Sequence, residues 1–418
     1  MTKTVTRPRG SVLAAVDVGS TKVCCFIARI ERGDAPRIIG IGHQVSRGVK
    51  NGVIVDLDAA ATSILNAVHA AEQMSGETID EVVVNLSGGF PPSRIVNVEV
   101  STAGREIGEA EMRRVLERGH QIREPSERNV IHSIPVGFSI DGSRGIRDPR
   151  GMFGQTLGVN MHLVTAHPAA VRNLTSAVGR SHLEIAGIVV SPYASGLACL
   201  VDDEMELGVT VIDMGGGTTT VGVFFDRNLI FADTVPVGGA HVTNDIARGL
   251  STPVAHAERM KTLYGNAIPS PADERETIAV PQVGEEDDVQ PNHVPKSLLT
   301  GIISPRLEET FELVRNRLEA SGFDKVAGRR VVLTGGACQL PGTRELAGLI
   351  LDKQIRVGKP VRMQGLAEAT GGPAFSTGLG LLQFAMSERA ETPRAARAAS
   401  EEPGGLFGRF GHWIRENF

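Results

Sequence analysis

Short apolar runs of strand length alternate with amphipathic stretches along most of the chain. Residues 12–19 and 22–30 form two strand-like runs around a turn, and residues 81–89 form an apolar strand that ends in glycines. Residues 57–74 carry apolar side chains at helical spacing, and Asp56 is placed to cap that helix. This alternation of strands with helices predicts an α/β fold.

The rhythm changes over residues 90–161, where charges and short strand signals are mixed. Within this region we expect a short helix over 114–122 and a pair of strands over 130–142. The region is therefore predicted to be a subdomain inserted into the α/β fold. Further on, residues 267–295 are acidic and rich in proline, which predicts a solvated loop with room for one edge strand. Residues 306–320 predict an amphipathic helix.

Composition narrows the class of protein. With 418 residues, 41% apolar and 22% charged, the chain resembles ordinary globular proteins large enough for two or more domains. The net charge of −5 and the lack of a basic stripe with interleaved aromatics argue against nucleic acid as a partner. No apolar run approaches the roughly 20 residues of a membrane-spanning helix, and the basic N-terminus lacks a signal-peptide pattern.

The four cysteines, at positions 24, 25, 199 and 338, show neither CxxC spacing nor a neighbouring histidine cluster. We therefore expect the reduced and mostly buried thiols of a cytoplasmic protein. The eleven histidines are scattered and none falls in an HExxH pattern, so no zinc site is predicted.

One pattern occurs twice in the chain. Residues 12–30 and 208–226 each contain β-type residues, an Asp, an apolar residue, glycine, small polar residues and a second β-type run. Asp17 and Asp213 occupy matching places in the two copies, and a third glycine turn lies within residues 331–342. Turns of this kind point several backbone N–H groups into one concavity, which binds phosphate oxygens.

Charged residues beside the turns complete this chemistry. Lys22 places a point charge beside the first turn, where it suits a β- or γ-phosphate. Asp17 and Asp213 precede the two turns and suit Mg²⁺ held through water. The alternative is that each hairpin is an ordinary tight turn capped by an Asp, with Lys22 solvated. The matched pair and the third turn favour phosphate binding, although the chain has neither a P-loop pattern nor a dinucleotide-binding GxGxxG.

Three stretches resemble motifs of the actin-like ATPase superfamily. The two phosphate motifs are matched by DVGSTK (17–22) and DMGGGTTTVGV (213–223), and the adenosine motif by TGGACQLPG (334–342). The Glu-x-x-Lys helix that lines the adenosine in that superfamily is matched by AERMKTLYG (257–265).

Other stretches resemble one family within that superfamily, the bacterial cell-division proteins of the FtsA type. They are ELGVTVIDMGGGTT (206–219), VPVGGAHVTNDIARGL (235–250), MHLVT (161–165), the insert after NLSGG, and the linker with an aromatic C-terminal stretch. The similarity covers nearly the whole chain.

This resemblance implies an actin-like α/β fold of two lobes with a nucleotide in the cleft between them. It places the first-lobe core at 1–87, 163–205 and 376–386, and a family-specific inserted subdomain at 88–162. It places the second lobe at 206–375, with a small subdomain at about 245–320, then a flexible linker at 387–405 and an amphipathic helix at 406–418.

The resemblance also implies roles for single residues towards ATP and Mg²⁺. Asp17 and Asp213 would lie near the Mg²⁺. The phosphates would contact Gly19, Ser20, Thr21 and Lys22 in the first turn, and Gly215, Gly216, Gly217, Thr218 and Thr219 in the second. The adenosine would contact Glu258, Lys261, Gly335, Gly336 and Gln339. Alternatively, Gln339 caps a local turn.

Hydrolysis of ATP requires a residue that orients or deprotonates the attacking water. In the superfamily this residue comes from the segment that corresponds to residues 191–198, which holds no acid and no Gln. Tyr193 and Ser195 are poor bases, and Asp202 and Asp203 are predicted to be loop residues. We therefore expect ATP binding with at most weak ATPase activity, and assign no catalytic residue.

The chain ends in an aromatic stretch, GGLFGRFGHWIRENF. On a helix, its apolar side chains gather on an arc roughly 140° wide. They are Leu406, Phe407, Phe410, Trp413, Ile414 and Phe418. Such a helix is too short to span a bilayer, but it suits the interface between lipid and water. The alternatives are a helix that docks on the protein's own core and a helix that binds a partner.

The resemblance to FtsA implies a scaffold that assembles as an actin-like polymer. It would tether FtsZ filaments to the cytoplasmic face of the inner membrane, as a peripheral protein at the division septum, and recruit later division proteins. Arg306 matches a basic position of the FtsZ-binding surface, although an exposed helical Arg is often simply solvated. Two other functions remain open: a superfamily enzyme such as a sugar kinase or an exopolyphosphatase, and an actin-like scaffold of pilus assembly.

Overall fold

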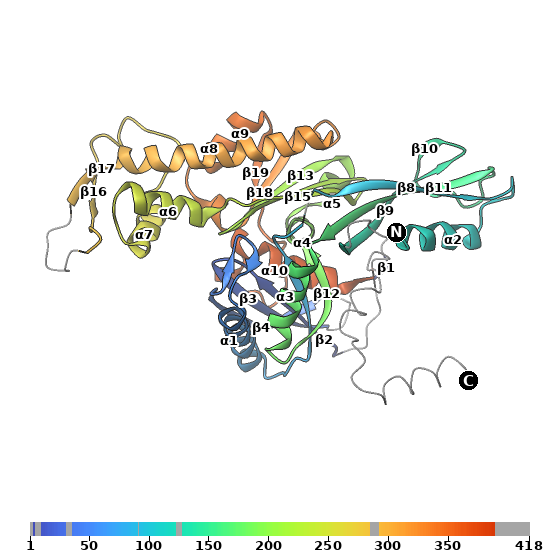
Figure 1. Cartoon of the computed structure of the whole chain (residues 1–418), viewed down its shortest axis with the longest axis horizontal. Helices are drawn as coiled ribbons and strands as arrows, with labels where there is room; N and C mark the ends of the chain where they lie inside the picture. The colour runs from blue at the N-terminus through green and yellow to red at the C-terminus, as the bar shows by residue number, and fades with distance from the viewer. Residues whose placement is uncertain are drawn as a thin grey trace.

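The computed structural model describes residues 3–4, 10–30, 36–90, 92–122, 128–284 and 292–388. It contains two five-stranded sheets and a four-stranded sheet, with helices packed against them (Figure 1). The predicted α/β class is confirmed. The predicted C-terminal helix and most of the linker before it lie outside the described residues.

The first five-stranded sheet is the core of the first lobe. Its strands in spatial order are β12 (Glu184–Val190), β7 (Glu81–Leu86), β2 (Val12–Val18), β3 (Lys22–Ile30) and β4 (Pro36–Val45). Strands β12, β7 and β2 are parallel, whereas β2, β3 and β4 are antiparallel neighbours. The parallel strands therefore end at one edge, where the turn after β2 begins.

The second five-stranded sheet repeats this topology. Its strands in spatial order are β15 (Asn228–Val235), β14 (Thr219–Phe225), β13 (Val209–Met214), β18 (Arg330–Thr334) and β19 (Gln354–Val357). Strands β13, β14 and β15 are antiparallel neighbours, and β13, β18 and β19 are parallel. The sequence repeat thus has a structural counterpart, because β2 and β13 hold the same place in their sheets.

Helices cover both faces of the first sheet. They are α1 (Leu57–Ser75), α3 (Pro168–Gly179), α4 (Ser191–Cys199) and α10 (Ser376–Met386). Helix α1 packs on β3 and β4, and α10 packs on β2, β7 and α4. A Cβ on Gly42 would lie 1.9 Å from the Ala67 carbonyl oxygen, so glycine in β4 is what lets α1 approach.

The prediction for residues 57–74 is confirmed by α1. The Asp56 carboxylate accepts a hydrogen bond from Ala59 N at 3.1 Å, which caps the first turn. The helix ends at Gly76, in the left-handed conformation with φ of 70°. The four cysteines are buried and unpaired in disulfides, as expected.

The helices of the second lobe pack around its sheet and beyond it (Figure 1). They are α6 (Gly239–Gly249), α7 (Val254–Tyr264), α8 (Lys296–Ser321) and α9 (Thr343–Leu351). The short helix α5 (Asp202–Leu207) precedes β13, and 3-10 turns occur at Gly336–Gln339, Glu368–Thr370 and Pro373–Phe375.

The helix predicted over 306–320 is shorter than the helix that the structure contains, α8 (Lys296–Ser321). Helix α8 begins at Lys296 and continues through Pro305, although proline normally breaks a helix. Leu299, Ile303 and Leu307 are buried on both sides of the proline, so packing of a continuous apolar face outweighs the lost hydrogen bond.

The acidic loop over 267–295 contains more structure than predicted. Strands β16 (Thr277–Val280) and β17 (Asn292–Pro295) pair as an antiparallel hairpin, where one edge strand was expected. Ile278 and Val280 are buried, which ties this segment to the core of the second lobe.

The inserted region forms a four-stranded antiparallel sheet with one helix. In spatial order the strands are β10 (Ser143–Ile146), β9 (Asn129–Ile140), β11 (Thr156–Ala166) and β8 (Arg94–Ser101). Helix α2 (Glu109–His120) packs on this sheet and starts five residues earlier than the sequence predicts. The strand pair predicted over 130–142 is instead one long strand, β9, which turns at Asp141 and Gly142 into β10.

Two further short strand pairings complete the described fold. Strands β5 (Val49–Lys50) and β6 (Val53–Ile54) form a small hairpin. Strands β1 (Lys3–Thr4) and β20 (Ser387–Glu388) pair with each other. The predicted linker therefore begins with two residues in a strand, where a flexible segment was expected. Among the described residues, no helix is long and apolar enough to cross a membrane.

A buried histidine joins the insert to the second lobe. His162 on β11 is fully buried, and its Nε2 lies 2.7 Å from the Ser93 Oγ. The same Ser93 Oγ accepts a hydrogen bond from Ala232 N on β15 at 2.7 Å. Burial lowers the pKa of His162 to about 3, so the ring is neutral in the folded protein.

This histidine is expected to make stability fall with acidity. Below its ordinary pKa of about 6.5 the unfolded chain binds the proton and the folded chain does not, so the stability is complete above pH 6.5 and is lost towards pH 3. At pH 5 the loss is about 2 kcal/mol. We predict that the melting temperature of the wild type exceeds that of His162→Gln by more at pH 7.5 than at pH 5. A margin that does not change with pH contradicts this.

Candidate functional site

The two repeated turns face each other at the meeting point of the lobes. A Cβ on Gly216 would lie 2.4 Å from the Thr21 Cγ2, and a Cβ on Gly217 would lie 2.4 Å from the Ser20 Oγ. The turns therefore pack directly against each other, and the two glycines provide the space. Ser20 is held in place by Gly52, whose N donates to the Ser20 Oγ at 2.9 Å.

A cavity of about 240 Å³ lies between these turns. Most of the residues that the sequence predicts for phosphates, Mg²⁺ and the third turn line it. They are Asp17, Gly19, Ser20, Thr21, Lys22, Asp213, Gly215, Gly216, Gly217, Thr218, Gly335 and Gly336. The structure thus brings together segments that are about 120 to 320 residues apart in the sequence.

Thr219 does not belong to this lining. Its side chain is fully buried, and its Oγ1 donates a 2.8 Å hydrogen bond to the Val237 carbonyl oxygen. Successive side chains of a strand point to opposite faces, so Thr219 on β14 faces away from the cavity that its neighbour Thr220 lines.

Two buried carboxylates and one lysine dominate the electrostatics of the cavity. Burial raises the pKa of Asp17 to about 7, and Lys22 opposes this shift. Burial also raises the pKa of Asp213, although Ser195 and Thr377 both donate hydrogen bonds to its Oδ2. A divalent cation bound here would favour the ionised form of both carboxylates.

Lys22 lies inside this site and is not a solvated hairpin lysine. Its Nζ donates to the Ala374 carbonyl oxygen at 2.7 Å and lies 3.4 Å from the centre of the Phe375 ring. A phosphate in the cavity would find this ammonium group beside the turn. The residues present therefore fit a phosphate chain with a divalent cation.

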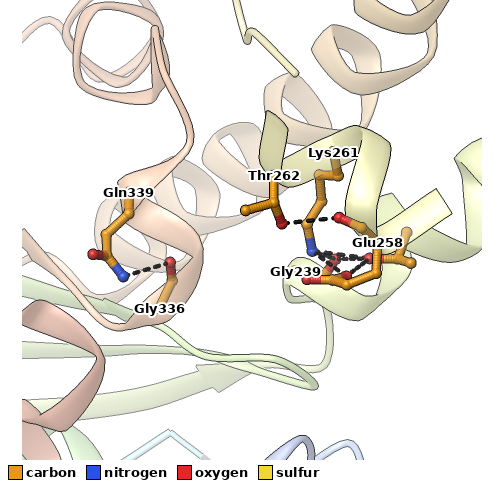
Figure 2. A network of polar contacts seen from close by, with 7 residues as sticks. Gly239, Glu258, Lys261, Thr262, Gly336 and Gln339 are labelled. Atoms are coloured by element: carbon orange, nitrogen blue, oxygen red, sulfur yellow. Dashed lines mark hydrogen bonds and ion pairs between the residues drawn. The ribbon is translucent and has the colours of Figure 1, made fainter. Parts of the chain in front are cut away.

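Glu258 and Lys261, predicted for the adenosine, lie next to the second turn. Lys261 Nζ bonds Glu258 at 2.7 Å, the Thr243 Oγ1 at 2.9 Å and the Gly239 carbonyl oxygen at 3.2 Å (Figure 2). Gly239 N in turn donates to the Gly215 carbonyl oxygen at 2.9 Å, so α6 and α7 are tied to the glycine turn.

Gln339 forms a local contact. Its Nε2 donates to the Gly336 carbonyl oxygen at 3.3 Å, within the 3-10 turn that both residues belong to. Figure 2 shows this pair on a separate segment from the Glu258–Lys261 pair. The alternative of a local cap thus describes the Gln339 contact in this structure.

Sequence reasoning missed several residues of the lining. They are Ser87, Ser191, Thr220, Pro373, Ala374 and Thr377. Ser87 and Ser191 follow β7 and β12, which run parallel to β2, so the shared edge of parallel strands was the available signal. Their hydroxyl oxygens lie 2.7 Å apart, and Asn85 Nδ2 donates to both.

The segment over 191–198 adds no acid to the cavity. It forms most of α4, where Tyr193 is buried against Phe224 and Phe384 and Ser195 donates to Asp213. The prediction that Asp202 and Asp203 lie in a loop is wrong, because both residues belong to the first turn of helix α5. Acidic side chains are stabilised there by the partial positive charge of the helix N-terminus. Among the described residues that line the cavity, the carboxylates are Asp17 and Asp213.

Arg306 forms ion pairs with two acidic side chains of this chain, Asp245 and Glu309. Its Nε and Nη2 lie 2.5 and 3.2 Å from the two carboxylate oxygens of Asp245 on α6, and Nη1 pairs with Glu309. This bidentate contact fastens α8 to α6.

The fold and the cavity define the class of protein. Two lobes of repeated topology with paired glycine turns between them form an actin-like fold, and solved structures agree. The PilM-PilN type IV pilus biogenesis complex matches with a TM-score of 0.62 and 17% identity, over 90% of this chain and 98% of that one. MreB5 of Spiroplasma citri bound to ADP matches with a TM-score of 0.51 and 13% identity, over 90% and 97%.

Sequence comparison identifies the family. The model for the cell division protein FtsA matches residues 210–380, and the model for the SHS2 domain inserted in FtsA matches residues 88–165. The cell division protein FtsA of Rhizobium meliloti is 48% identical over 98% of this chain and 96% of that protein. The FtsA of Pseudomonas aeruginosa is 33% identical over 98% and 99%. The chain belongs to the FtsA family, and its role is in bacterial cell division.

Proposed function

We propose that this chain is an ATP-binding scaffold that tethers FtsZ filaments to the inner membrane. It acts from the cytoplasmic face at the division septum, assembles with further copies of itself and recruits later division proteins. The C-terminal helix over 406–418 is the membrane anchor. The observation that carries the proposal is the cavity between the two glycine turns, with Lys22 and two buried carboxylates on its wall.

The ATP-binding part is tested by calorimetry with the full chain. We expect ATP to bind in the presence of Mg²⁺ and to bind more weakly in EDTA, because Asp17 and Asp213 lose the cation that balances their charges. Lys22→Met is expected to weaken ATP binding at least about tenfold, since it removes a charge-assisted hydrogen bond. Wild-type protein that shows no heat of binding for ATP with Mg²⁺ contradicts the proposal.

The anchor is supported by sequence pattern and chain connection. The last described strand, β20, follows α10 directly and pairs with β1, so the linker leaves from the first lobe. A coil over the remaining linker residues, 389–405, would reach roughly 23 Å root-mean-square. One short helix gives weak and reversible attachment, whereas a polymer presents many helices at high effective concentration. Assembly would therefore decide how long the protein stays on the membrane.

We place the contact with FtsZ on the second lobe and propose that Arg306 takes part in it. An acidic partner segment would take the place of Asp245 on the guanidinium group. This makes Asp245→Asn the informative companion of Arg306→Gln, because the first removes the competing carboxylate and the second removes the cation.

We predict that Arg306→Gln weakens binding of the FtsZ C-terminal peptide about tenfold and that Asp245→Asn retains or strengthens it. Fluorescence anisotropy of a labelled peptide measures both. If both variants weaken binding equally, Arg306 acts only by fastening α8 to α6. If neither does, Arg306 is not part of the contact.

The relatives favour this function over the two alternatives. The matched curated relatives named above are cell division proteins, whereas the similarity to the pilus biogenesis complex is 17% in sequence and concerns the fold. A sugar kinase or an exopolyphosphatase requires an acidic base poised beside its substrate. Rapid sugar phosphorylation by the purified protein would favour the enzyme instead.

A further inference from the structure

Thr220 is buried in the wall of the cavity with a hydroxyl group that no protein atom satisfies. The residue is 1% exposed and lines the cavity, and its Oγ1 has no hydrogen-bond partner. Within the part of the chain that the structure describes, no other residue of this lining has such an orphaned side-chain atom. An unsatisfied buried hydroxyl costs free energy unless a ligand satisfies it.

The neighbours of Thr220 explain why its hydroxyl remains available. In the sheet it lies directly between Asp213 on β13 and Thr234 on β15. The Asp213 carboxylate accepts from Ser195 and Thr377, and Thr234 Oγ1 donates to the Ser87 carbonyl oxygen at 2.9 Å. Asp213 and Thr234 therefore already have hydrogen-bond partners. Among the described residues, the Thr220 hydroxyl between them has no such partner.

The order of the strands shows which end of a ligand Thr220 would meet. Going across the sheet, β18 leads to the turn at Gly335, β13 carries Asp213, and β14 carries Thr220. The adenosine is proposed for the Gly335 side, and the phosphates for the turn after Asp213. Thr220 is one strand further from the adenosine, and it lines the cavity together with the first-lobe residue Ser87. A nucleotide placed in this way points its last phosphate towards Thr220.

We propose that the Thr220 hydroxyl donates a hydrogen bond to the terminal phosphate of a bound nucleoside triphosphate, so that the site distinguishes triphosphate from diphosphate. This inference rests on the proposed ATP binding. Thr220 acts as a specificity residue for the triphosphate. Its cross-strand neighbour Thr234 is hydrogen-bonded to Ser87 of the first lobe, so Thr220 lies where the two lobes meet.

The test compares binding of ADP and of the non-hydrolysable analogue AMPPNP, both with Mg²⁺, by calorimetry on the full chain. Thr220→Val keeps the shape of the side chain and removes the hydroxyl. We expect it to lower the AMPPNP affinity about tenfold and to leave the ADP affinity unchanged. Thr220→Ser is expected to restore the preference. Thermal melting shows that each variant is folded.

Thr234→Val is the matched control. It removes a hydroxyl from the neighbouring strand, but that hydroxyl is already bound to Ser87, so it is expected to lower stability and keep the ratio of the two affinities. The inference is overturned if Thr220→Val shows the wild-type ratio, or if it weakens ADP and AMPPNP equally. If the wild type binds neither nucleotide, the ATP-binding proposal fails and this inference fails with it.

Discussion

Gly335→Ala is expected to abolish measurable nucleotide binding and to lower the free energy of unfolding by at least about 2 kcal/mol. Gly335 has a φ of 85°, a conformation that alanine adopts only under strain. An added Cβ would lie 2.4 Å from the Asp213 Oδ1 and 2.5 Å from the Met214 carbonyl oxygen. The substitution therefore displaces a carboxylate proposed for Mg²⁺ and the strand that leads into the second turn.

The adjacent glycine provides the control for stability. At Gly336 an added Cβ would meet only the Ala374 Cβ at 3.7 Å, an ordinary van der Waals contact. The free energy of unfolding of Gly336→Ala, measured by urea titration, is thus expected to lie within about 0.5 kcal/mol of the wild-type value. Equal unfolding midpoints for both variants, with nucleotide affinity retained in Gly335→Ala, would show that the third turn does not shape the cavity.

Trp413→Glu is expected to reduce co-sedimentation with lipid vesicles by more than about tenfold. Burial of a large apolar side chain contributes about 1.5–3 kcal/mol, and each 1.4 kcal/mol is a factor of ten in affinity. The substitution also places a charge on the face proposed to enter the lipid. Vesicles with and without anionic lipid separate this apolar effect from simple charge repulsion.

His412→Glu is the matched control for the anchor. It introduces the same residue at the preceding position, which falls on the polar side of the helical projection. Vesicle binding close to that of the wild type is expected. If both variants sediment like the wild type, the stretch over 404–418 is not the anchor, and docking on the protein itself or on a partner explains it better.

The repeated turns and α1 were predictable because their signals are local. Asp56 and Gly76 mark the two ends of a single 19-residue helix, and the repeat of Asp17 in Asp213 is visible in the sequence alone. The resemblance to FtsA made it possible to predict the family as well, together with most of the residues that line the cavity. Local patterns cannot show which of the two adjacent threonines, Thr219 and Thr220, lines the cavity.

The remaining errors have a common physical cause, which is contact between distant segments. Helix α8 passes through Pro305 because buried residues on both sides pack into one core. Thr219 faces away and Thr220 faces the cavity because of the register of β14 with β13. Ser87 and Ser191 meet only because β7 and β12 are neighbours in a sheet. These facts depend on contacts between segments far apart in the sequence, which the local spacing of residues does not encode.

Recovery of FtsZ with lipid vesicles is the most direct test of whether this chain tethers FtsZ to a membrane. Preassembled FtsZ filaments are centrifuged with vesicles at a speed that leaves the filaments themselves in solution, with the full chain and with Trp413→Glu, in ATP and Mg²⁺. We predict that FtsZ sediments with the vesicles only when the wild-type chain is present. FtsZ that stays in solution with the wild-type chain, or sediments equally with Trp413→Glu, would contradict it.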